Sequence, residues 1–415
     1  MHKILFSLMA VQFCAAGYAA AQETPGQADS PQLPAQTLTA NSGPSPYTLK
    51  LQYTGETWDN AAGGLRTGLV YIHNVDGQIY VNTDKAFGWT GGSFLIEAFY
   101  NNSRSLDTQY VTSAQDPSAI DTSGVSMVRL YQAYYKQDWG DTSLLAGIYD
   151  LETEFGSTRP MELFFNGAYA WTFTLDQSGL TGPSTYPNTA PAVRFRQYFG
   201  DDWSVQAAVL DGVSDSVKKP GDNTVIFNKR YGLMAIGEVD YQPLPRTKIM
   251  AGYWNYTGQF QALDEYNPDG SARSVSGSSG GYVGAATRLY TEQGRRGLDG
   301  FVNFGFADGK VNQVTRQINA GLNYTGLFAD RPTDQLGLAA GLALDGAPYR
   351  HSLLDQGDGV YHSELNLELT YRARLTSWLT VQPDFQYFVH PNMDPTLKND
   401  VLFGLHFEIG HLFDL

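Results

Sequence analysis

Residues 361–375 alternate between apolar and polar side chains with a period of two, which is the period of a β-strand. Odd positions include Leu365 and Leu367, whereas even positions include Glu364 and Glu368. An average globular strand has roughly 5–6 residues, and a tilted strand needs about 9–11 residues to cross a bilayer. The length of this run therefore favours a strand of a membrane barrel.

The alternation resumes at residues 379–389 after only three intervening residues, so the two runs predict a hairpin with one apolar and one polar face. Similar runs continue along the chain. We mark sixteen of them: 47–58, 65–83, 93–101, 127–136, 143–150, 192–199, 204–211, 230–241, 247–258, 282–292, 298–307, 314–325, 335–345, 361–375, 379–389 and 401–412.

Long and short connections alternate between these runs. The longest span 102–126 and 151–191, whereas 200–203 and 376–378 are among the shortest. An outer-membrane barrel has short periplasmic turns and longer extracellular loops. The sequence therefore predicts an all-β fold, a transmembrane up-and-down antiparallel β-barrel of about sixteen strands with short periplasmic turns and long extracellular loops. Pro383 interrupts its predicted strand, and we expect a bulge or an irregular bond there.

The amino terminus has the pattern of an exported protein. We predict a signal peptide at 1–21, a flexible proline-rich lead-in at 22–46 and the barrel at 47–415. The single cysteine, Cys14, lies in the predicted signal peptide, so we expect no disulfide. The predicted location is the outer membrane of a Gram-negative bacterium, with outer-membrane lipid and lipopolysaccharide as surroundings.

The net charge of −15 argues against nucleic acid as a partner, because nucleic-acid binding depends on neutralising phosphates with Lys and Arg. No Gly-x-Ser-x-Gly, phosphate-loop or His-Glu-x-x-His motif is present. His406 and His411 are five residues apart and would point to opposite faces of a strand. We therefore predict no enzyme, catalytic residue, cofactor or metal.

A water-filled barrel would carry its polar row inside, and a sugar pore needs aromatic faces and hydrogen-bonding groups that bind weakly enough to release. The long connection 151–191 is the predicted constriction, because a connection of that length must pack somewhere. The candidate pore-lining and constriction residues are Arg194, Arg196, Trp254, Arg288, Tyr290, Glu364, Glu368, Arg372, Asp384, Glu154, Arg159 and Trp171.

The carboxy-terminal part of the chain resembles a known family. The runs 368–372, Trp378-Leu379 and 382–387, followed by Pro391 and Gly404, resemble the closing strands of OprB-type carbohydrate-selective porins. Shorter upstream pieces appear in the order of that family, from Gly63-Gly64-Leu65-Arg66 to Arg331-Pro332, so the similarity spans about 55–410. One departure is His406, where the family usually has arginine.

The resemblance implies a sixteen-stranded outer-membrane barrel that passes small sugars by diffusion. We therefore predict a porin for passive, carbohydrate-selective diffusion of small neutral sugars, and we leave a homo-oligomer open. Two alternatives remain open at this point: an outer-membrane barrel enzyme acting on lipid or polysaccharide, and an exported soluble β-sandwich binding module.

Overall fold

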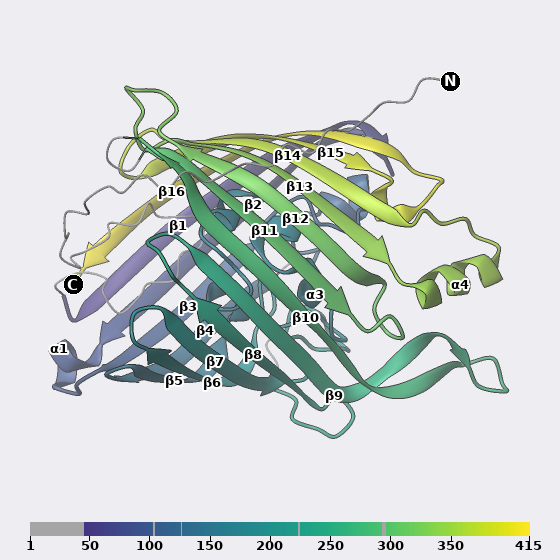
Figure 1. Cartoon of the computed structure of the whole chain (residues 1–415), viewed down its shortest axis with the longest axis horizontal. Helices are drawn as coiled ribbons and strands as arrows, with labels where there is room; N and C mark the ends of the chain where they lie inside the picture. Colours follow the sequence, from purple (N-terminus) through teal and green to yellow (C-terminus); the bar gives the residue numbers. More distant parts are fainter. Residues whose placement is uncertain (1–44, 103, 126, 223–224, 293–295) are drawn as a thin grey trace. The chain divides into compact units, whose positions relative to one another are not determined.

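The computed structural model describes residues 45–415 apart from 103, 126, 223–224 and 293–295. In this part of the chain, sixteen antiparallel strands form one closed barrel, in which neighbours in sequence pair and β1 also pairs with β16 (Figure 1). The strands are β1 Tyr47–Gly64, β2 Gly68–Asn82, β3 Gly92–Asn101, β4 Met127–Trp139, β5 Thr142–Tyr149, β6 Ala190–Phe199, β7 Trp203–Asp211, β8 Leu233–Tyr241, β9 Lys248–Tyr266, β10 Ala272–Thr291, β11 Gly297–Ala307, β12 Val314–Thr325, β13 Gln335–Asp345, β14 Ser363–Arg374, β15 Leu379–Val389 and β16 Lys398–Asp414.

The helical segments are short and lie in the connections. They are α1 Thr83–Phe87, α2 Gly167–Ala170, α3 Phe173–Asp176, α4 Ala347–Gln356, η1 Asp107–Val111, η2 Leu151–Thr153, η3 Met161–Leu163 and η4 Pro391–Met393. Within the described residues, no helix combines the length and the apolar sequence of a membrane crossing. The predicted signal peptide and most of the predicted lead-in lie outside the described residues and stay predictions.

The two rows of side chains separate as the alternation predicts. On β14, the outward residues Leu367 and Leu369 are 38% and 45% exposed, whereas the inward residues Glu364 and Glu368 are buried. Because the sheet closes on itself, each of its sixteen strands pairs with a neighbour on both sides. The predicted barrel is confirmed, and the sandwich alternative is wrong.

The first and last strands of the described chain have their outermost residues, Tyr47 and Asp414, at the same end of the barrel. Thr48 of β1 pairs with Asp414 of β16, and the Leu415 amide donates to the Tyr47 carbonyl at 3.0 Å. With an even number of strands, the long connections 102–126 and 150–189 therefore leave from the opposite end. This is the arrangement of an outer-membrane barrel, whose long loops face outside, so we call that opposite end the outer end.

The predicted loop between residues 258 and 282 is a hairpin formed by extensions of β9 and β10. The alternation ends near residue 258 and resumes near 282, but β9 and β10 continue beyond these limits to a turn in which the Asn267 amide donates to the Ser271 carbonyl at 2.8 Å. Figure 1 shows this hairpin extending past the neighbouring strands. In this part of β9 the outward residues Thr257, Gln259 and Gln261 are polar and exposed, whereas Phe260 and Ala262 are buried on the inner side. The outward face lies beyond the lipid-facing wall, so it does not need to be apolar.

Pro383 produces an irregularity but no bulge. The β14–β15 pairing runs from Thr370 opposite Asp384 to Ala373 opposite Val381 in one register, and the pairs between them are missing. On its other side Pro383 pairs in register with Leu405 of β16. A missing donor therefore interrupts the ladder locally without shifting either strand.

Candidate functional site

Two long connections from the outer end fold into the barrel. We call residues 104–125 loop A and residues 150–189 loop B. Loop B is bound by inward-facing side chains of strands on different sides of the closed sheet, namely Arg194 of β6, Glu238 of β8 and Glu368 of β14. A segment that reaches all these strands must lie inside the barrel.

Loop B is held first by apolar packing. Its buried residues include Phe155, Trp171 and Phe173, and they form one cluster with inward residues of the wall such as Met234 and Trp254. Helix α3 lies against β10, β11 and β12. The inner wall is therefore apolar along one side, and loop B covers this side with its own apolar residues.

Two wall carboxylates bind the backbone of the inner loops. Glu364 accepts hydrogen bonds from the amides of Ala114 and Gln115 of loop A at 2.8 and 2.9 Å. Glu368 accepts from the amides of Phe165 and Asn166 of loop B at 2.8 and 3.0 Å. Buried backbone amides need a partner, so these carboxylates supply what a strand neighbour supplies elsewhere.

Side-chain amides of the wall bind loop carbonyl groups in the same way. The Gln382 Nε2 donates to the Leu163 carbonyl and the Gln386 Nε2 to the Pro117 carbonyl, both at 2.8 Å. On the other side of the barrel, the Gln206 Nε2 donates to the Glu154 carbonyl at 2.7 Å. The inner loops are thus fixed at many points around the wall.

Glu154 of loop B pairs with two arginines of β6. Its carboxylate lies 2.6 Å from the Arg194 Nε and 3.2 Å from the Arg196 guanidinium. Burial would raise the pKa of Glu154, but the charges of Arg196 and Arg194 outweigh burial and hold this pKa below its ordinary value. The ion pairs therefore join the start of loop B to the wall.

The segment of loop B around η3 carries further charges. Arg159 is exposed and Glu162 is half-buried. Burial raises the pKa of Glu162 to about 7, against the opposing charges of Arg159, Lys248 and Arg372. The Lys248 Nζ also donates to the Ser157 carbonyl at 3.2 Å and lies 3.2 Å from Asp240. Loop and wall charges of both signs therefore meet in the lumen.

His406 of β16 lies between two carboxylates of the wall, one on β1 and one on β16. Its Nδ1 lies 3.0 Å from Glu56 and its Nε2 lies 3.1 Å from Glu408. Because both ring nitrogens face carboxylate oxygens, a doubly protonated ring satisfies both contacts. The Phe165 ring of loop B lies 4.7 Å from the imidazole. Loop B therefore also packs against this charged part of the wall.

Comparison with known proteins identifies the family. The model described as "Carbohydrate-selective porin, OprB family" matches residues 66–410, which is most of the chain. The chain belongs to the OprB family of carbohydrate-selective porins. It is a porin of the Gram-negative outer membrane that passes sugars, and it is a channel rather than an enzyme.

Relatives agree with this family. Porin B of Pseudomonas aeruginosa is 26% identical over 402 residues, which cover 86% of each chain. The high-pH structure of Pseudomonas putida OprB superposes with a TM-score of 0.79 at 21% identity, covering 88% of this chain and 94% of that one. The outer-membrane channel DcaP of Acinetobacter baumannii has a TM-score of 0.53 at 10% identity, covering 88% and 97%. The two structures show a shared fold.

The structure places most candidate residues of this OprB-family chain on the inner face. Arg194, Arg196, Arg288, Arg372 and Asp384 are inward residues of the wall, in the positions that the alternation predicts. Arg288 pairs with Asp299 at 2.6 Å and Arg372 with Glu408 at 3.4 Å. A role in contact with sugar stays a prediction for each of them.

Three candidates do not face an open lumen. Trp171 and Trp254 are only 2% and 0% exposed because they pack in the cluster between loop B and the wall, so neither presents a face to a passing sugar. Tyr290 points outward: the register shifts between Arg288 and Tyr290, and Tyr290 pairs with Leu298 in an outer row. The prediction that Tyr290 faces the lumen is therefore wrong.

The sequence analysis did not predict that loop A packs inside the barrel, that Glu162 belongs to the site, or that Glu364 and Glu368 anchor the loops. The sequence does indicate Glu162, since it is the one charge in the otherwise apolar stretch 160–165. It does not indicate the anchoring roles, because a carboxylate that binds loop amides and one that lines water occupy the same alternating positions of a strand. The length of 151–191 did predict correctly that this connection packs inside.

The raised pKa of Glu162 predicts a pH-dependent ion preference. Lowering the pH from 8 to 6 protonates Glu162, removes one negative charge and reduces the cation-to-anion permeability ratio. A unit charge about 6 Å from a permeant ion contributes about 0.7 kcal/mol in water, or about threefold. The measurement is the reversal potential of planar bilayers in a salt gradient at both pH values.

The E162Q variant is the comparison that isolates this residue, because burial also raises the pKa values of Asp150 and Asp176 in loop B to about 7. At pH 8, E162Q is expected to have a lower cation-to-anion permeability ratio than the wild type, and its ratio should fall less than that of the wild type between pH 8 and pH 6. The control is E265Q on the outer hairpin, which should behave as the wild type does. An equal pH response in E162Q and wild type contradicts the prediction.

Proposed function

We propose that Arg159 and Glu162 of loop B, facing Lys248 and Arg372 of the wall, form the constriction through which small neutral sugars diffuse. The observation that carries this proposal is the meeting of these four charges within a barrel that loop B otherwise fills with apolar packing. Arg159 is exposed and Glu162 and Lys248 are half-buried, so these three side chains are the groups that a permeant can contact. Arg372 is buried beside Glu408 and acts on the constriction through its charge.

The chemistry of these groups suits a neutral polyol. Guanidinium and ammonium groups donate hydrogen bonds and carboxylates accept them, so together they serve both functions of a sugar hydroxyl. A single ion meets attraction from one sign and repulsion from the other, whereas a neutral sugar exchanges hydrogen bonds with both. Weak, multiple contacts of this kind permit entry and release.

The proposed transport is passive. Both inner loops are tied to the wall by buried hydrogen bonds from Glu364, Glu368, Gln382 and Gln386. A constriction built on loops fixed in this way acts as a static filter, and selectivity depends on its size and its hydrogen-bonding groups.

Liposome swelling tests both the passage of sugars and the assignment of the constriction. Wild-type protein is expected to admit glucose much faster than a trisaccharide. R159A is expected to reduce this preference several-fold, since it shortens a side chain at the constriction and removes its donors. The matched control is R273A, which changes an exposed arginine on the outer hairpin.

The two possible failures differ. Swelling no greater than that of empty vesicles would contradict sugar passage through this chain. Normal glucose entry with an unchanged preference in R159A would leave sugar passage intact and contradict the assignment of the constriction.

A further inference from the structure

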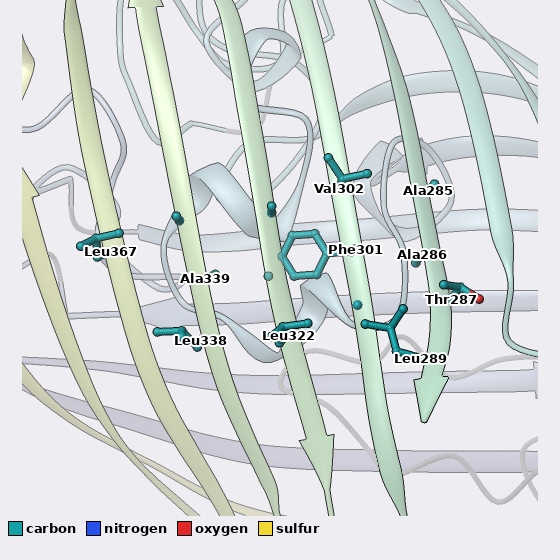
Figure 2. Close-up of a pocket in the computed structure, with 14 residues that line it drawn as sticks. Ala285, Ala286, Thr287, Leu289, Phe301, Val302, Leu322, Leu338, Ala339 and Leu367 are labelled. Carbon is teal, nitrogen blue, oxygen red and sulfur yellow. The ribbon is translucent and has the colours of Figure 1, made fainter. Parts of the chain in front are cut away.

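The outer wall carries an apolar hollow across β10–β14. Its volume is about 700 Å³, and Figure 2 shows Val302, Leu322, Leu338 and Leu367 around it. Most outward side chains of this wall are large, so a hollow of this size in the lipid-facing surface requires a local cause.

The cause is a group of small residues in adjacent rows. Ala285, Val302, Ala320, Ala340 and Leu367 follow one another in register across five strands, so three of the five positions in this outward row are alanines. In the next row, Gly300 pairs with Leu322. The hollow is therefore built by sequence at specific positions of the wall.

Gly300 contributes for a steric reason. A Cβ at this position would lie 2.7 Å from the Leu289 Cδ1 and 3.4 Å from the Leu322 Cδ2. Both leucines are exposed outward residues. Any side chain on residue 300 would therefore fill the hollow or displace these leucines, and glycine keeps it open.

A cation lies above the hollow on the same face of β12. Arg316 is exposed and precedes Ala320 by four residues, so both point outward, about 13 Å apart along the strand. Its cross-strand neighbours are Phe306 and Leu344. Among the described residues, no carboxylate lies within ion-pair distance of Arg316.

We propose that this surface binds one molecule of lipid A, with an acyl chain in the hollow and a phosphate at Arg316. Arg316 lies near the start of β12, at the outer end of the barrel, where the phosphate of an outer-leaflet lipid would be. Arginine binds phosphate through paired, charge-assisted hydrogen bonds. An acyl chain restores the contacts that the side chains around an empty hollow would lack.

A second copy of this chain fits the surface less well. In a two-fold interface the same patch meets itself, so hollow would face hollow and the space would stay unfilled. Such an interface would also bring two Arg316 side chains toward each other. A flexible acyl chain with an anionic head has neither problem.

Native mass spectrometry of the purified, delipidated barrel titrated with bisphosphorylated lipid A tests this proposal. Wild-type protein is expected to bind one lipid A. A320F/A340F, which fills the hollow, and R316Q, which removes the cation, are each expected to weaken binding about tenfold. R316Q should bind dephosphorylated lipid A as well as the wild type does, because the lost contact is to phosphate.

Two matched controls are available. A98F adds the same side chain at an exposed outward alanine of β3, and K398Q removes an exposed cation at the outer end of β16. Both are expected to bind lipid A as the wild type does. Glucose entry should be unchanged in A320F/A340F and R316Q, because these residues lie on the outer face.

Wild-type binding of lipid A by A320F/A340F or by R316Q would overturn the proposal. An oligomer in the wild type that A320F/A340F converts to monomer would also overturn it, in favour of a second copy as the occupant. If A320F/A340F lacks the gel mobility shift of a folded barrel on heating, R316Q and the dephosphorylated lipid decide alone.

Discussion

Replacing Glu364 and Glu368 together by alanine is expected to raise the single-channel conductance several-fold. The substitution leaves the amides of Ala114, Gln115, Phe165 and Asn166 without their carboxylate partners. A buried donor left unsatisfied costs about 1–3 kcal/mol. Both inner loops should therefore leave their positions on β14 and widen the path through the lumen.

The measurement is conductance of the double variant in planar bilayers, together with its mobility shift on heating in detergent gels to show that the barrel is folded. E364Q/E368Q is the matched variant, because the side-chain amide oxygen of each glutamine still accepts a hydrogen bond. Its conductance should lie between that of the wild type and that of the double-alanine variant. A folded double-alanine variant with wild-type conductance would show that these anchors do not hold the loops.

E154A is expected to destabilise the folded barrel by about 3–5 kcal/mol, the cost of removing one partner of a buried ion pair. The Arg194 side chain is fully buried and would keep its charge without the carboxylate of Glu154. The shift in unfolding midpoint in urea, followed by the gel mobility of unheated protein, measures this cost. E265A breaks an exposed pair with Arg273 and should cost about 0–1 kcal/mol.

The effect of E154A should depend on pH with a definite sign. The pKa of Glu154 is held below 4.5 in the folded protein, so its stabilising contribution is present above that value and is lost as the pH falls through the lower folded pKa. The difference in stability between wild type and E154A should therefore shrink in strong acid. A difference that grows in acid would mean that the arginines do not lower this pKa.

Alternation predicted the strands well because it follows from the contact of one face with lipid. The prediction from alternation failed where a strand leaves the lipid-facing wall or where the pairing register shifts. The outer half of the β9–β10 hairpin carries polar residues on its outward face. The register shift between Arg288 and Tyr290 places Tyr290 on the outer face. Period alone does not show such a shift.

The site was predicted less fully than the fold. The length of loop B indicated that it packs inside, but not which wall residues it would meet. Trp171 and Trp254 were predicted to face the pore as aromatic residues, whereas they pack against apolar neighbours under the loop. Choosing between water and a covering loop for an inward residue requires the tertiary contacts of that loop.

The apolar inner wall has a consequence for the stability of the barrel. Without loop B, the inner side of β8 to β11 would expose Met234, Trp254 and Phe301 to the water of the lumen, beside charged residues such as Glu238 and Asp299. Exposure of apolar residues to water is unfavourable. Entry of the longest loop into the barrel therefore stabilises the part of the wall that this loop covers.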